Sequence, residues 1–214
     1  MTLPEPFGWR TSWIAVKMAE ARLMCADLRL TRTRSCDWEV GLREASQDGI
    51  FLTPSIEGWT LVVGLSLPDA AADETLPLIV SLSERYGSTQ YFGNHRVVDY
   101  YAWARAERGR LKRAFAYLGE QGVVLWDRGE LTVEEAELGQ NFFEPVSAEN
   151  LANHSVMEPL TGLKKNQRFP TEHDVFRIAY KWSIDPTQIQ EYEISGDSGI
   201  LGYFEISRLA KSIS

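Results

Sequence analysis

Short apolar runs predict strands at several points along the chain. The runs lie at 13–16, 50–53 and 59–65, and the last is apolar almost throughout, which is typical of a central strand covered on both faces. The bridge between the second and third runs contains a proline and a glycine, as hairpin loops often do. The tail that begins at Gly199 indicates one further short strand.

Aromatic rings and alanines alternate in the middle of the chain. With a period of two, Tyr101 and Trp103 lie on one face of a strand and Tyr100 lies on the other. A two-residue turn at 108–109 would place large rings opposite small residues of the next strand, with Trp103 opposite Ala114. This complementarity of size fills two packing layers, so we interpret the dense aromatic stretch as a sheet rather than a catalytic cluster.

A second turn, at 120–121, extends this hairpin into a meander. It would place Leu118 opposite Val123 and Phe115 opposite Trp126. We therefore predict a single α+β domain that spans the whole chain, 1–214. Its core would be an antiparallel sheet, a meander of about four to six strands, with helices packed against it.

Helices are predicted from apolar stripes and from capping residues. The marker residues are Met18, Ala21, Cys25 and Leu28 for the first helix, Leu76, Ile79 and Leu82 for the second, Thr132 and Glu135 for the third, and Thr171 and Asp174 for the fourth. In the third and fourth helices a threonine precedes an acidic residue by three positions, which is the spacing of a capping box. Residues 141–170 have no sustained period and are predicted to form an irregular excursion or long loop.

Composition argues against several classes of protein. Apolar residues make up 44% of the chain, which is enough for a core, and the formal net charge is -8. An acidic chain is a poor match for nucleic acid, because phosphate binding depends on clustered lysine and arginine. No apolar run approaches the length of a membrane span and no secretory signal is recognisable, so we expect a cytoplasmic protein that does not contact a membrane.

The cysteines and histidines form no recognisable catalytic or metal motif. Cys25 and Cys36 belong to no CxxC pattern, and the sequence leaves open whether they form a disulfide. The chain contains no GxSxG, GxGxxG, HExxH or phosphate-binding loop. We therefore expect no metal and no cofactor, and we favour a binding protein over an enzyme.

Acidic residues gather in one segment near the end of the predicted meander. They are Asp127, Glu130, Glu134, Glu135 and Glu137. Runs of this kind are often solvated surface, but they can also attract a cationic protein, because complementary charge raises the rate of encounter. We expect these five carboxylates to form a docking surface for a basic protein partner.

A ligand pocket between the sheet and the helices is the alternative interpretation. Its expected lining is His95, Arg96, Tyr100, Trp103 and Tyr117. Histidine can act as an acid or base near neutral pH, and on a strand His95 and Asp99 would share a face. No nucleophile occurs at a matching spacing, so the pocket suits a small ligand or an enzyme of unspecified reaction.

Four segments resemble a family of bacterial proteins that has no assigned reaction. The segments are EPFGWRTSW, FLTPSIEGWTLVVGLSLP, QYFGNHRVVDYYAWARAERGRLKRAFAYLGEQG and FPTEHDVFRIAYKWSIDP. The resemblance covers nearly the whole chain and implies no catalytic residue or cofactor. By analogy of type, small acidic α+β proteins of this kind look like immunity proteins, which neutralise the toxins of neighbouring bacteria by stoichiometric binding. The expected partner is then a basic toxin domain.

Overall fold

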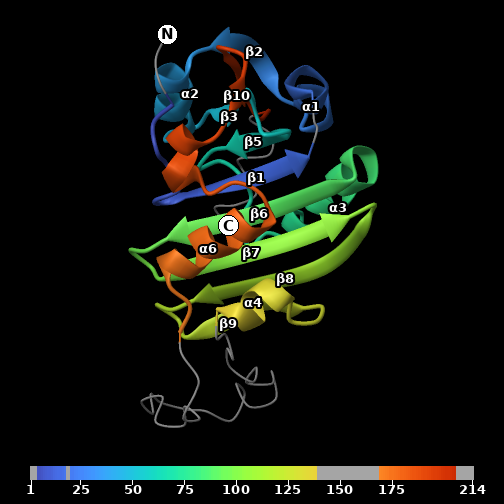
Figure 1. Ribbon diagram of the computed structural model, residues 1–214, viewed down its shortest axis with the longest axis vertical. Helices are drawn as coiled ribbons and strands as arrows, with labels where there is room; N and C mark the ends of the chain where they lie inside the picture. The colour runs from blue at the N-terminus through green and yellow to red at the C-terminus, as the bar shows by residue number, and fades with distance from the viewer. Residues whose placement is uncertain (1–3, 18–19, 139–168, 206–214) are drawn as a thin grey trace.

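The computed structural model describes residues 4–17, 20–138 and 169–205, which form an antiparallel sheet with helices on both faces (Figure 1). The strands are β1 (Thr11–Lys17), β2 (Thr31–Cys36), β3 (Ile50–Leu52), β4 (Ser55–Ile56), β5 (Trp59–Val63), β6 (Ser88–His95), β7 (Tyr100–Glu107), β8 (Arg110–Leu118), β9 (Val123–Arg128), β10 (Ile194–Ser195) and β11 (Gly199–Tyr203). The helices are α1 (Ala21–Asp27), α2 (Trp38–Ala45), α3 (Thr75–Tyr86), α4 (Val133–Glu137), α6 (Glu172–Trp182) and the 3₁₀ helix η1 (Pro186–Glu191).

The strand order is β2-β11-β3-β5-β1-β6-β7-β8-β9, and β4 and β10 attach beside β5. Every pairing is antiparallel, which confirms the predicted α+β class with an antiparallel sheet. The prediction of four to six strands is wrong, because the sheet formed by the described residues has eleven. The apolar pattern misses β2, which is polar and mostly exposed, and it misses β4 and β10, since strands of two residues have no period.

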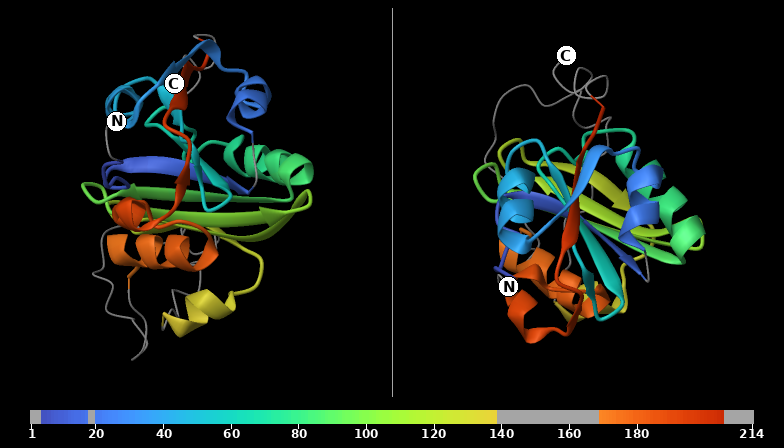
Figure 2. Two further views of the ribbon diagram at one scale, coloured as in Figure 1. Left: turned by 45° about the horizontal axis from the view of Figure 1, so that its top comes forward. Right: turned by 90° about the horizontal axis from the view of Figure 1, so that it is seen from above.

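Helices cover both faces of the sheet, as the view from above shows (Figure 2). On one side, called here the α3 face, α1 and α3 pack against a core that includes Ile14 and Tyr91. On the other side, called the α6 face, α2, α6 and η1 pack against a core that includes Trp13, Phe92 and Trp103. The sheet therefore separates two apolar cores.

Strands β7 and β8 of the meander place most of their rings on one face of the sheet and their alanines on the other. The α6 face carries Tyr101, Trp103, Phe115 and Tyr117, and the α3 face carries Tyr100, Ala102, Ala104, Ala106, Ala114 and Ala116. The predicted division of β7, with Tyr101 and Trp103 on one side and Tyr100 on the other, is confirmed. The buried alanines let α3 lie close to the strands, because their side chains are single methyl groups that occupy little space between the helix and the sheet.

Pairing between β7 and β8 differs from the predicted register. The turn at 108–109 forms with positive φ at both central residues, but Lys112 is an extra residue in β8 and shifts the later pairs by one position. Trp103 therefore lies opposite Phe115 rather than Ala114, with ring centroids 4.8 Å apart. The prediction of rings opposite alanines is wrong: rings face rings, and alanines face alanines.

A second bulge shifts the pairing between β8 and β9. The pair next to the turn forms as predicted, but Leu125 is an extra residue in β9. Phe115 consequently lies opposite Asp127 rather than Trp126. Because opposite residues share a face, this slip places Asp127 on the α6 face and leaves Trp126 in the core of the α3 face, beside Tyr91.

Both predicted capping boxes are confirmed, at Thr132 with Glu135 and at Thr171 with Asp174. The first predicted helix forms as α1, and residues 18–19 lie outside the described part of the chain. Helix α2 was not predicted, although Asp37 before it is an N-cap residue whose side chain accepts the Val40 N–H at 2.9 Å. The predicted excursion at 141–170 lies almost entirely outside the described residues.

Replacing Ala104 with leucine tests the close packing on the α3 face. Ala104 is fully buried opposite Ala114, so the larger side chain would overpack the layer beneath α3. We expect Ala104→Leu to lower the free energy of unfolding by about 1–3 kcal/mol in urea denaturation. Ala136→Leu is the control, because Ala136 is exposed on α4 and the same substitution there should cost less than about 0.5 kcal/mol. Equal losses would contradict the packing described.

Candidate functional site

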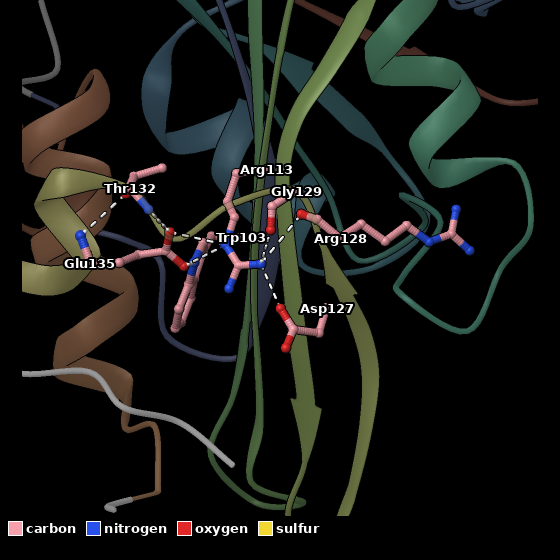
Figure 3. Close-up of polar contacts among 7 residues, drawn as sticks. All are labelled: Trp103, Arg113, Asp127, Arg128, Gly129, Thr132 and Glu135. Atoms are coloured by element: carbon pink, nitrogen blue, oxygen red, sulfur yellow. Dashed lines mark hydrogen bonds and ion pairs between the residues drawn. The ribbon is translucent and has the colours of Figure 1, made fainter. Parts of the chain in front are cut away.

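A buried ionic cluster joins the meander to α4 (Figure 3). Arg113 on β8 is 3% exposed, and Glu135 on α4 is fully buried. The Arg113 Nε donates to both carboxylate oxygens of Glu135, at 2.9 and 3.0 Å. The indole Nε1 of Trp103, on β7, donates to the same carboxylate at 2.8 Å. Two strands thus hold one carboxylate of the helix.

The same guanidinium also holds the chain that leads from β9 toward α4. Its Nη1 donates to the Asp127 carboxylate at 2.5 Å and to the carbonyl oxygens of Arg128 and Gly129 at 3.3 and 3.2 Å. Gly129 has φ of +79°, and a Cβ built there would lie 2.1 Å from the carbonyl oxygen of Lys112. Glycine is required at this position, because the loop passes directly against the backbone of β8.

Glu135 also caps the helix to which it belongs. Its Oε2 accepts the Thr132 N–H at 2.9 Å, and the Thr132 Oγ1 accepts the Glu135 N–H at 3.2 Å. A helix of five residues has little stability of its own, so its place depends on these contacts and on packing. The cluster therefore fixes the position of the whole segment from Asp127 to Glu137.

The outer side of this segment combines exposed apolar residues with carboxylates. Leu131 is 45% exposed and Val133 is 72% exposed. We define the α4 surface as Asp127, Glu130, Leu131, Val133, Glu134 and Glu137. Isolated exposed apolar residues are common, and what distinguishes these two is their position on an anchored segment whose neighbouring side chains are carboxylates.

The structure separates the five carboxylates predicted to dock a partner. Glu135 points inward and is inaccessible, whereas Glu130 is exposed. Asp127 is partly engaged, because it pairs with Arg113 while 34% of its side chain stays exposed. Glu137 pairs with Lys181 at 3.0 Å on the surface.

The fifth carboxylate, Glu134, is half-buried. Burial by itself would raise its pKa, but hydrogen bonds, including one from its own backbone N–H, and the charge of Arg105 lower the pKa overall. Glu134 is therefore held in its charged form. Four of the five predicted acidic residues contribute to the α4 surface, and the remaining one anchors it.

The five residues of the alternative pocket lie in separate places. Trp103 and Tyr117 are buried on the α6 face, Tyr100 is buried on the α3 face, and Arg96 is exposed in the turn after β6. His95 and Tyr100 line a common cavity of about 270 Å³. The sheet itself separates this cavity from the two rings of the opposite face.

The prediction that His95 and Asp99 share a strand face is wrong. Strand β6 ends at His95, and the chain turns before β7 with Asp99 at φ of +51°. The Asp99 carboxylate instead accepts a hydrogen bond from the Tyr101 hydroxyl at 3.1 Å. Burial, followed by this carboxylate, raises the pKa of Tyr101 to about 12. The arrangement is a structural contact rather than an acid–base pair.

Sequence reasoning placed Arg113 in neither predicted site, although it is the centre of the ionic cluster. Its partner Glu135 was assigned to a docking surface because it belongs to an acidic run. The capping-box spacing from Thr132 to Glu135 was the available signal, since it indicates that the Glu135 side chain turns back toward the helix start.

Cys25 and Cys36 are free thiols, and burial raises the pKa of each. Within the described residues, no group of three or more His, Cys, Asp and Glu side chains is arranged to hold a metal ion. No helix in the same part of the chain has the length and apolar character to cross a membrane.

No protein-family model, curated protein or solved structure matches the chain, so its function is inferred from the geometry of the site.

Substitution of Glu135 tests the anchoring role of the cluster. Removing this carboxylate leaves the buried Arg113 charge with the partly exposed Asp127 as its one remaining carboxylate partner among the described residues. We expect Glu135→Ala to lower the free energy of unfolding by about 3 kcal/mol or more in urea denaturation. The control is Glu137→Ala, which removes an exposed ion pair and should cost less than about 1 kcal/mol. Similar values for the two variants would show that the cluster anchors nothing.

Alkaline pH tests the burial of Tyr91. Burial raises its pKa to about 12, whereas tyrosine in an unfolded chain has a pKa of about 10. The unfolded state therefore loses its proton first, so this contribution to stability is complete below about pH 10 and is lost as the pH rises to about 12. We expect Tyr91→Phe to flatten the fall of stability over this range by up to about 1.4 kcal/mol per pH unit. The exposed Tyr180, changed to Phe, should leave the slope unaltered.

Proposed function

We propose that this chain is an immunity protein that neutralises a toxin domain by stoichiometric binding, with the α4 surface as its main contact. The observation that carries the proposal is the exposed pair Leu131 and Val133 among carboxylates, on a segment anchored by a buried ionic cluster. Interfaces of this kind place apolar contacts at the centre and polar groups at the rim.

Anchoring favours a binding role because a surface that is already ordered loses little conformational entropy when the partner docks. Arg113 and Glu135 fix both ends of the segment, at the end of β9 and in α4. Val133 begins the helix directly after its cap, so the cap sets the place of the most exposed apolar side chain on this surface.

Charge supports a basic partner. The chain has a formal net charge of -8, and Glu130, Glu134 and Glu137 add local negative charge around the two apolar side chains. An acidic field of this kind speeds the approach of a cationic domain and disfavours acidic competitors. In this proposal the protein acts in the cytoplasm, and it inhibits by covering the basic cleft of the toxin.

The test is co-expression with the proteins encoded next to this gene, followed by affinity measurement on the pair that forms. We expect one neighbour to be toxic alone, to be neutralised by this chain and to form a 1:1 complex. Leu131→Asp with Val133→Asp should weaken that complex by at least about 100-fold. Val97→Asp is the matched control, since Val97 is 67% exposed elsewhere on the molecule, and it should leave affinity unchanged.

Charge reversal separates the role of the acidic residues of the α4 surface from that of its apolar residues. Glu130→Lys with Glu137→Lys should slow association mainly, and the effect should shrink as salt rises, because exposed charges are screened. If the double variant of Leu131 and Val133 bound and neutralised the toxic neighbour as tightly as the unsubstituted protein does, that result would show that the toxin contacts a surface other than the α4 surface. The absence of any toxic or binding neighbour would overturn the immunity function itself.

A further inference from the structure

A small cavity lies on the α3 face, away from the α4 surface. Its volume is about 270 Å³. One wall is apolar and consists of Leu65, Leu67, Val98, Leu118 and Leu125. The polar part of the lining includes Arg10, Ser12, His95 and Tyr100. No residue of this lining belongs to the α4 surface, so the cavity can be considered independently.

Three hydroxyl groups form a chain that ends at this cavity. The Ser12 Oγ lies 3.0 Å from the Tyr91 hydroxyl oxygen, which lies 3.1 Å from the Tyr100 hydroxyl oxygen. The Tyr100 oxygen also accepts the Ala70 N–H at 2.9 Å. Tyr91, in the middle, is fully buried, whereas Ser12 and Tyr100 at the two ends both line the cavity.

One hydroxyl proton of these three groups has no acceptor within the group. Three hydroxyl protons are available for two internal hydrogen bonds. In the part of the chain that the structure describes, the buried Tyr91 proton has only Ser12 and Tyr100 as acceptors. If Tyr91 donates to Ser12, Tyr100 must donate to Tyr91 and the Ser12 proton is left over. If Tyr91 donates to Tyr100, Ser12 donates to Tyr91 and the Tyr100 proton is left over. In both cases the remaining donor belongs to a group that lines the cavity.

One cationic side chain, Arg10, lines the same cavity as this donor. Arg10 and His95 line the same cavity, and Arg10 forms no ion pair with any described residue. Asp69 is the carboxylate of the lining, and its Oδ1 accepts the Ala71 N–H at 2.8 Å. The cavity thus combines an apolar wall, a hydroxyl donor that has no further acceptor among the described residues and an arginine, which is the lining of a pocket for an amphiphilic ligand.

We propose that this cavity binds a small molecule that has an apolar body and one carboxylate. The apolar body would lie against the leucine-rich wall. The carboxylate would accept the hydroxyl proton left over at Ser12 or Tyr100 and would face Arg10. A charge-assisted hydrogen bond to a carboxylate is stronger than one to a neutral acceptor, which favours an acid over an alcohol of the same shape.

Benzoate is a suitable probe, with benzyl alcohol as its neutral analogue. We expect a benzoate titration of ¹⁵N-labelled full-length protein to shift the amide signals of Ser12, Ala70 and Val98 in a saturable way, at or below millimolar concentration. Benzyl alcohol should bind at least about tenfold more weakly, because it cannot form the charge-assisted bond. Equal affinity for the two probes, or no saturable shift with benzoate, would overturn the proposal. So would saturable shifts confined to residues outside the cavity.

The hydroxyl chain is tested by removing both of its ends. The double variant Ser12→Ala with Tyr100→Phe lacks both hydroxyl groups that could donate a proton to a ligand in the cavity. Its affinity for benzoate should fall at least about tenfold. Tyr180→Phe removes a hydroxyl from an exposed position and should leave the affinity unchanged. Unchanged affinity in a folded double variant would refute the role of the chain. If that variant does not fold, the comparison of benzoate with benzyl alcohol on the unsubstituted protein still decides the proposal.

Discussion

The charge of Arg113 is the constraint that organises one end of this molecule. A guanidinium with almost no exposure must be surrounded by acceptors, because an unpaired buried charge is severely destabilising. Its acceptors come from the end of β9, from the loop that follows and from α4. The short helix lies where it does because its glutamate neutralises this charge, and the exposed residues around that glutamate take their positions from it.

Two inserted residues make this arrangement possible. Without the bulges at Lys112 and Leu125, the pairing would follow the simple register of the two turns. The second bulge brings Asp127 to the side of the sheet on which Arg113 lies, and leaves the indole of Trp126 in the opposite core. Bulges also raise the local twist, and they are frequent near the edge of a sheet, where β8 and β9 lie.

Much of the framework could be predicted from the sequence, because local signals carry it. The two capping boxes depend on residues three positions apart, and the faces of β7 depend on a period of two. Register across strands could not be predicted in the same way, since an extra residue at Lys112 changes no apolar pattern. The polar edge strand β2 and the two-residue strands were missed because nothing periodic marks them.

The candidate site shows the same division between local and long-range information. The acidic run was visible in the sequence, but the inward direction of Glu135 depends on Arg113 and Trp103, which precede it by 22 and 32 positions. In the alternative pocket, His95 and Tyr100 meet at a cavity, whereas Trp103 falls on the other side of the sheet. A side chain's neighbours across the fold, rather than its type, decided its role in both cases.

Gly129 determines how closely the loop before α4 approaches β8. The crossing of the loop over β8 leaves less room there than one methyl group needs. Any larger residue would lift the crossing point away from the strand, and with it the carbonyl that Arg113 holds. The contact between Arg113 and the loop that leads to α4 therefore depends on the absence of a side chain at position 129.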